Sequence, residues 1–99
     1  MLKKKFFKTK EEAEVTFEYM HPDAKEVELV ADFTQWQPVT MTFSKKYQVF
    51  RAKLRLPKNS EFHFRYRVNE QTWDNDYEAD AYVANGFGSD NSVVSTHAV

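Results

Sequence analysis

The stretch that decides the fold is residues 47–68, which read YQVFRAKLRLPKNSEFHFRYRV. From Phe50 to Leu56 apolar residues alternate with Arg and Lys, and from Phe62 to Val68 they alternate with His and Arg. A period of two places the apolar side chains on one face of a strand and the charged ones on the other. Residues 57–60 (PKNS), between the two runs, have the composition of a turn. The stretch therefore predicts two half-buried antiparallel strands joined as a hairpin.

The same alternation continues outside this hairpin. Residues 14–19 and 27–33 alternate apolar and polar side chains, with HPDAK at 21–25 between them. Residues 40–43 form a shorter candidate strand, and a β-branched run at 92–96 closes the chain. Six or seven short strands with turn signals about every 8–12 residues predict an all-β fold, a β-sandwich of about seven antiparallel strands.

Length and composition limit the class of protein. The 99 residues fit one domain, which we place at residues 13–99, after a flexible or edge-pairing N-terminal lead at 1–12. A net charge of -1 argues against a nucleic-acid partner, which requires an excess of Lys and Arg. The chain has no Cys, and no apolar run approaches the roughly 18 residues that cross a bilayer.

The basic start, MLKKKFFK, lacks the apolar core of a secretory signal. We interpret it as a solvated end, in preference to a membrane or RNA contact. We therefore expect a cytoplasmic location, with neither a nucleic acid nor a membrane as partner.

Catalytic and metal sites have little support. The three His lie far apart in sequence, and no Ser lies in a nucleophile-elbow context. The acidic run from Asp74 to Asp80 lacks the Gly and the closing Glu of an EF-hand loop. We interpret this run as a solvated or capping loop in which Asp76 and Asp80 accept backbone N–H bonds. We expect no enzyme activity, no metal and no cofactor.

The two tryptophans are the strongest candidates for a binding site. Trp36 and Trp73 each lie among polar residues at the end of a predicted strand. One interpretation is that both cap the core, with only the indole N–H reaching a partner. The other is sugar binding, because the negative face of an indole matches the apolar, slightly positive C–H face of a pyranose ring.

Three segments, in order along the chain, resemble a known family. They are residues 27–36 (VELVADFTQW), residues 64–68 (FRYRV) and residues 75–94. They are similar to parts of carbohydrate-binding module family 48: a strand ending in a Gly-x-Phe-x-x-Trp turn, a strand carrying Lys or Arg ahead of a loop Trp, and the closing segment of bacterial members. Ala31 stands in place of the usual Gly, and Asn69-Glu70 in place of an Asp-Gly turn. The resemblance covers about residues 13–96.

This family includes the glycogen-binding domain of AMP-activated protein kinase β subunits and the N-terminal early-set domains of isoamylases and branching enzymes. The resemblance implies an immunoglobulin-like β-sandwich of the early-set type and non-catalytic binding of an α-glucan, such as glycogen, starch or a maltooligosaccharide. It implies that Trp36 and Trp73 stack on sugars and that Arg65 bonds glucose hydroxyls. Phe87 would insert beside the glucan, and the amide of Asn91 would read a hydroxyl.

A second function stays open at this point. The same sandwich could be a regulatory module that docks on a protein partner, such as an amylolytic enzyme or a kinase, without binding glucan. The dense aromatic content fits either function, since Trp and Tyr also anchor protein interfaces.

Overall fold

The computed structural model describes residues 1–86 and 88–97, which form ten strands and one short 3-10 helix. Within these residues no helix has the length and apolar character needed to span a lipid bilayer. The strands are β1 (Leu2–Phe6), β2 (Glu12–Tyr19), β3 (Val27–Ala31), β4 (Val39–Thr40), β5 (Thr42–Ser44), β6 (Val49–Pro57), β7 (Glu61–Val68), β8 (Thr72–Asp74), β9 (Ala81–Ala84) and β10 (Asp90–Ser95), and the helix is η1 (Asp32–Thr34).

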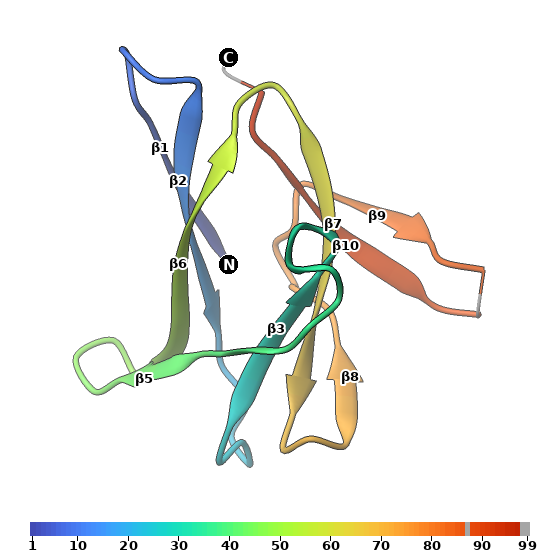
Figure 1. Ribbon diagram of the computed structural model, residues 1–99. Helices are drawn as coiled ribbons and strands as arrows, with labels where there is room; N and C mark the ends of the chain where they lie inside the picture. Colours follow the sequence, from blue (N-terminus) through green and yellow to red (C-terminus); the bar gives the residue numbers. More distant parts are fainter. Residues whose placement is uncertain (87, 98–99) are drawn as a thin grey trace.

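The strands form two antiparallel sheets that face each other (Figure 1). Sheet A has the order β1-β2-β6-β5, and sheet B has the order β4-β3-β7-β10-β9. On the side away from β3, β7 pairs with β10 along its first half and with β8 along its second half. Two antiparallel sheets around one core make an immunoglobulin-like β-sandwich, which confirms the predicted fold class.

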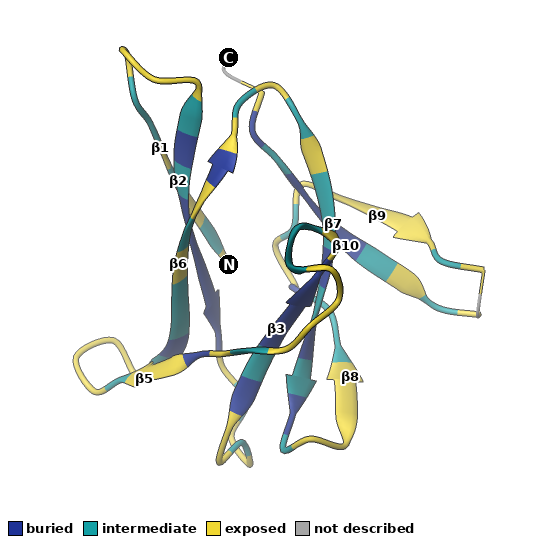
Figure 2. Cartoon of the chain, in the orientation of Figure 1, coloured by how far each residue is buried: buried dark blue, intermediate teal, exposed yellow. Residues whose placement is uncertain are grey.

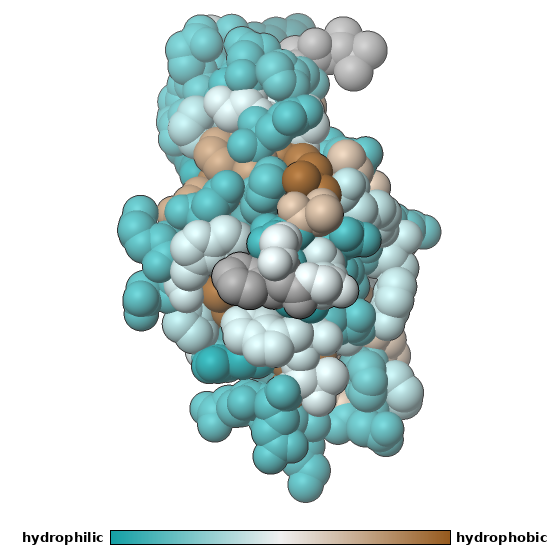
Figure 3. Space-filling view, turned by 90° about the vertical axis from the view of Figure 1, so that its right-hand side faces the viewer, coloured by the Kyte–Doolittle hydropathy of each residue, from teal (hydrophilic) through white to brown (hydrophobic). Residues whose placement is uncertain are grey.

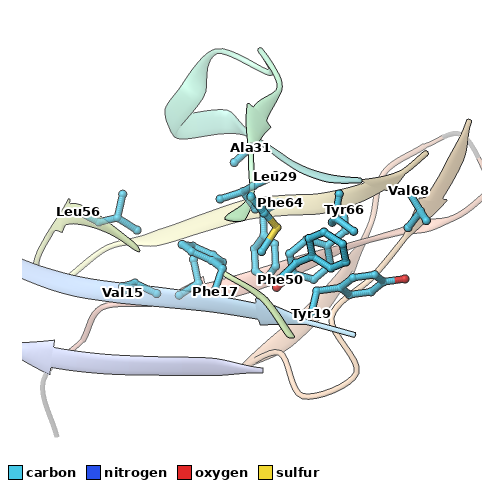
Figure 4. Packing of buried hydrophobic residues seen from close by; sticks show 13 residues of the cluster. Val15, Phe17, Tyr19, Leu29, Ala31, Phe50, Leu56, Phe64, Tyr66 and Val68 are labelled. Atoms are coloured by element: carbon cyan, nitrogen blue, oxygen red, sulfur yellow. The ribbon is translucent and has the colours of Figure 1, made fainter. Parts of the chain in front are cut away.

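The core between the sheets is rich in aromatic side chains (Figures 2 and 4). Phe17 from β2 meets Phe64 from β7 edge to face, with 5.0 Å between the ring centroids. Tyr19 and Tyr66, from the same two strands, lie 4.5 Å apart. Tilted and edge-to-face contacts suit the quadrupoles of aromatic rings. Because β7 turns its Phe and Tyr residues inward, its His and Arg residues lie on the outer face of sheet B.

The chain crosses between the sheets where the sequence predicts a single strand over residues 40–43. That prediction is wrong: β4 pairs with β3 in sheet B, whereas β5 pairs with β6 in sheet A. Met41, between β4 and β5, is 3% exposed and belongs to the core cluster. A buried side chain at the crossing point therefore splits the expected strand into two short ones.

Two further strands, β8 and β9, lie where the sequence predicts none. Residues 2–6, within the expected flexible or edge-pairing N-terminal lead, form β1 and pair with β2 at the edge of sheet A. The predicted strand over 27–33 also ends early, at Ala31, because the chain turns into η1. Ala31 is buried in an extended conformation (φ -148°), so this position needs no Gly.

One buried carboxylate fixes the segment between β8 and β9. The fully buried side chain of Asp76 accepts hydrogen bonds from the Tyr66 hydroxyl at 2.7 Å and from the Glu78 backbone N–H at 2.8 Å. The Asp76 backbone N–H donates to the Ser92 hydroxyl at 2.9 Å. Burial, together with the Asp76 carboxylate, raises the pKa of Tyr66 well above its ordinary value. The Tyr66 hydroxyl therefore keeps its proton and stays a donor.

Candidate functional site

Four of the five residues predicted to bind sugar lie around one hollow on the outer face of sheet B. Trp36, Arg65, Trp73 and Asn91 line it, together with Asn85. Trp36 lies in the turn after β3, Arg65 in β7, Trp73 in β8, Asn91 in β10, and Asn85 directly after the end of β9. The hollow is open and has a volume of about 370 Å³. The fifth predicted residue, Phe87, lies outside the described residues.

Trp36 is held by a tightly bonded turn. Its backbone N–H donates to the Ala31 carbonyl at 2.8 Å. The Thr34 hydroxyl bridges the turn, with contacts of 2.9 Å to the carbonyl oxygens of Ala31 and of Gln37. Gln35 and Trp36 both have positive φ, at 53° and 58°, in a region that side-chain-bearing residues seldom adopt. This backbone leaves the Trp36 side chain 46% exposed.

Trp73 is presented by a hairpin. Asn69 and Glu70 both have positive φ, and the Gln71 N–H donates to the Val68 carbonyl at 3.0 Å, which closes a tight turn. The turn places Trp73 directly opposite Arg67 on the outer face of the sheet. The Trp73 side chain is 46% exposed, the same fraction as that of Trp36.

Two guanidinium groups lie against the Trp73 ring. Those of Arg65 and Arg67 are 5.7 and 5.8 Å from the ring centroid, within reach of a cation–π contact. Arg67 is itself held by Glu28, with N–O distances of 2.8 and 2.9 Å. These contacts fix the orientation of the indole while about half of its surface stays open to solvent.

The polar rim of the hollow is linked through the Ser89 hydroxyl. Ser89 Oγ accepts a hydrogen bond from Asn85 Nδ2 at 2.9 Å and a long one from Arg65 Nη1 at 3.4 Å. Asn85 Nδ2 also lies 3.4 Å from Asn91 Oδ1. The rim therefore presents amide and guanidinium groups, which can donate to or accept from hydroxyls. Sequence reasoning missed Asn85, because only the β9–β10 hairpin brings it beside Asn91.

The outer face also has a small apolar layer that is separate from the core. Val30 lies directly opposite Arg65, and Val93 directly opposite His63, so both valines share the outer face with those side chains. They are nevertheless only 3% and 2% exposed, and neither belongs to the core cluster. The sequence could have indicated the role of Val30, since Val30 is the only apolar residue among the outward-facing residues of its strand.

Asp74 connects β8 to sheet A. Its carboxylate accepts hydrogen bonds from the Tyr19 hydroxyl at 2.6 Å and the Tyr77 hydroxyl at 2.7 Å. Burial alone would raise the pKa of Asp74, but the two tyrosine hydroxyls, the Asn75 backbone N–H and the nearby His21 outweigh it, so the pKa is lowered. For Tyr19, burial and the bond to Asp74 raise the pKa. The network anchors the strand that carries Trp73.

The substitution Asp74→Asn is expected to lower the free energy of unfolding at pH 7 by about 1 kcal/mol, because the amide is a weaker acceptor for the two hydroxyls. A carboxyl whose folded-state pKa is depressed stabilises the fold above its unfolded pKa of roughly 3.9, and this contribution is lost as pH falls through the folded pKa. In urea unfolding, the difference in the free energy of unfolding between wild type and variant should therefore become smaller below about pH 4. Asp23→Asn, at an exposed position, should change the free energy of unfolding at pH 7 by less than about 0.5 kcal/mol. A difference between wild type and Asp74→Asn that does not depend on pH would contradict the assignment.

The comparisons with known proteins agree with this geometry. The family model of carbohydrate-binding module 48 (isoamylase N-terminal domain) matches residues 6–83 of the 99-residue chain. The chain belongs to this family. A search of curated proteins gave no match. Membership in the carbohydrate-binding module 48 family makes a carbohydrate the general class of ligand for the chain.

Other chemistry has little support among the described residues. Residues 1–86 and 88–97 contain no group of three or more His, Asp or Glu side chains placed to hold a metal ion. In the acidic run, Asp76 and Asp80 accept backbone N–H bonds, from Glu78 and Ser95, as the sequence predicts. A second hollow, of about 240 Å³, has a largely apolar lining with only two carboxylates. It is lined by Met1, Glu18, Tyr19, Met20, Val49, Tyr77 and Glu78.

Proposed function

We propose that this carbohydrate-binding module 48 domain binds α-glucan chains without catalysing their cleavage. The observation that carries the proposal is that two indoles, each about half exposed, line one hollow together with Arg65 and Asn91. Core-capping tryptophans would be covered by neighbouring side chains, whereas these two offer open ring surface. The choice of an α-linked glucan rests on the resemblance of the sequence to glycogen-binding domains.

Stacking supplies the main attraction in this proposal. A pyranose ring placed on each indole removes apolar area from water and sets the C–H face of the sugar against the negative face of the ring. The guanidinium of Arg65 and the amides of Asn85 and Asn91 then bond the hydroxyls at the sugar edge.

The affinity should be modest. Each hydrogen bond to a sugar replaces one to water, so its net contribution is small. Two stacking contacts with a few such bonds correspond to a Kd of roughly 10 μM to 1 mM, or about -4 to -7 kcal/mol.

Tryptophan fluorescence gives a direct test, because the chain contains only the two tryptophans that line the hollow. Titration with maltoheptaose should quench or blue-shift the emission with a saturable curve in that concentration range. Cellohexaose, a β-linked glucan, is the matched control and should produce a much weaker change. Emission that stays unchanged up to about 10 mM maltoheptaose would reject the proposal, since that is roughly ten times the weakest expected Kd.

A further inference from the structure

The fold separates charges that nearly cancel in the sequence. Residues 1–20 and 42–60, which form sheet A and its turns, carry eleven of the 14 Lys and Arg but only four of the 15 Asp and Glu. The rest of the chain carries only three Lys and Arg but eleven Asp and Glu. A net charge of -1 therefore conceals one strongly basic sheet and one acidic half.

The positive charge is concentrated on the outer face of sheet A. The registers of β1, β2 and β6 place five basic side chains on that face, and we call this surface the cationic face. It consists of Lys3, Lys5, Arg51, Lys53 and Arg55.

Glu14 and Glu18, two acidic residues of this face, lie in the central strand β2, between the basic side chains of β1 and β6. The Glu18 side chain is 6% exposed and pairs with Lys3 at 3.3 Å and with Arg51 at 3.0 Å. Glu14 lies 4.0 Å from Lys53. Lys3 and Lys53 remain 53% and 58% exposed. The carboxylates of Glu14 and Glu18 are thus recessed between two rows of cations. Glu12, the third acidic residue of the outward set, lies at the end of β2 opposite Pro57, so the middle of the face presents a basic layer to solvent.

An aromatic ring lies within reach of cations at each of two places on this face. Lys5, Lys10 and Arg55 lie 5.0–5.8 Å from the centroid of Phe7. Lys3, Lys46 and Arg51 lie 5.2–5.4 Å from the centroid of Tyr47. Cation–π contacts of this kind hold flexible basic side chains in place before any partner arrives. Pre-ordered cations lose less side-chain entropy on binding.

We propose that the cationic face docks an acidic segment of a partner protein, and that it does so independently of glucan binding on sheet B. Cations that alternate along β1 and β6 recur every two residues, about 6.8 Å, which is the spacing of side chains on one side of an extended acidic peptide. Surface carboxylates on such a partner would meet guanidinium and ammonium groups across the outer face of sheet A, an arrangement that favours steering and specificity.

Three other occupants fit less well. Single-stranded nucleic acid stacks successive bases on aromatic side chains along one groove, whereas Phe7 and Tyr47 lie at two separate places on this face, beside Arg55 and Arg51. Membrane insertion needs a cluster of protruding apolar side chains, whereas the outward positions along the middle of these strands are charged or polar, with the apolar Val49 and Pro57 only at the two ends of β6. A second copy of the chain offers no matching surface, because its carboxylates are spread over the loops at 23–26 and 70, the segment 74–80 and the edge of sheet B.

The test uses immobilised poly-L-glutamate as the probe, with the whole chain in solution. Binding should be saturable at low ionic strength and weaken as salt rises, because released counterions and screening act on every charge pair. The triple substitution Lys5→Gln/Lys10→Gln/Lys46→Gln removes exposed charges that form no ion pair with Glu14 or Glu18. It should weaken binding about tenfold, given roughly 0.2–1 kcal/mol for each exposed pair.

Two variants with the same change in net charge test whether the position of the charge matters. Lys46→Glu and Lys25→Glu change the net charge equally, but only Lys46 lies beside the cationic face. Lys46→Glu should weaken poly-L-glutamate binding several-fold and Lys25→Glu hardly at all, with unfolding curves checked for both. Equal effects of the two would overturn the proposal, as would absence of binding at low salt. Equal or tighter binding to oligo-dT or to phosphatidylglycerol vesicles would overturn it as well, in favour of those partners.

Discussion

The double substitution Trp36→Ala/Trp73→Ala is expected to abolish the retardation of the chain in glycogen-containing native gels. Each indole is about half exposed, so covering it with a sugar ring contributes roughly 1–2 kcal/mol. Each single Ala variant should then lose about 5- to 30-fold in affinity, and the double variant should fall below detection, given a starting Kd no tighter than roughly 10 μM.

Matched variants separate stacking from general effects. Trp36→Phe and Trp73→Phe keep a flat ring and should retain part of the affinity. Tyr47→Ala removes an aromatic side chain of similar exposure (49%) from the opposite sheet and should leave glycogen retardation unchanged. All variants should unfold cooperatively. A double Ala variant that migrates like Tyr47→Ala in glycogen would refute the site, although it would leave the fold intact.

Asp76→Ala should cause the largest loss of stability, about 3–5 kcal/mol by urea or thermal unfolding. The substitution strips the buried Tyr66 hydroxyl and the Glu78 N–H of their acceptor, and each buried donor left without a partner costs about 1–3 kcal/mol. It also releases the segment that joins β8, which carries Trp73, to β9. Near the folding midpoint, loss of glucan binding should therefore accompany loss of stability.

Asp80→Ala provides the comparison within the same segment. The Asp80 side chain is 34% exposed, and it pairs with Lys4 at 2.5 Å and accepts the Ser95 N–H at 2.8 Å. Its removal should cost no more than about 1 kcal/mol, since an exposed ion pair contributes little. A loss at Asp80 equal to that at Asp76 would show that burial of the Asp76 carboxylate is not the cause.

The fold could be predicted from the sequence because β-strand burial follows a period of two. The alternation of Phe and Tyr with Arg in β7 assigned both its inner and its outer face correctly. The split between β4 and β5 could not be predicted in this way, because Met41 joins the core from a crossing point where no alternation operates. Strands β8 and β9 could not be predicted either, because they are short and lack the alternation of apolar and charged residues, although each pairs with a strand adjacent in sequence, β7 and β10.

The candidate site was only partly predictable. Trp36, Arg65, Trp73 and Asn91 could be named through resemblance, and the fold brings them to one hollow. Asn85 could not be named, because its neighbours are set by the hairpin of β9 and β10. In Figure 3, which views the molecule from the side of that hairpin, small hydrophobic areas lie among hydrophilic and intermediate ones.

The cationic face could not be predicted from the sequence for a related reason. The sequence offers a short run of Lys at its start and scattered basic residues between 45 and 58. These come together only because β1 and β6 flank β2 in the same sheet. The net charge is a sum over the whole chain, so it cannot show that strand order places the basic and acidic residues on different parts of the fold.

The two indoles are held in different ways by the backbone. Trp73 belongs to a strand that pairs with β7, whereas Trp36 ends a short turn that is closed by backbone bonds to Ala31, Asp32 and Thr34 and by the Thr34 hydroxyl. In both cases the backbone that carries the ring is already hydrogen-bonded in the free protein. A glucan spanning both rings would therefore have little backbone to order, and more of the stacking energy would remain as net affinity.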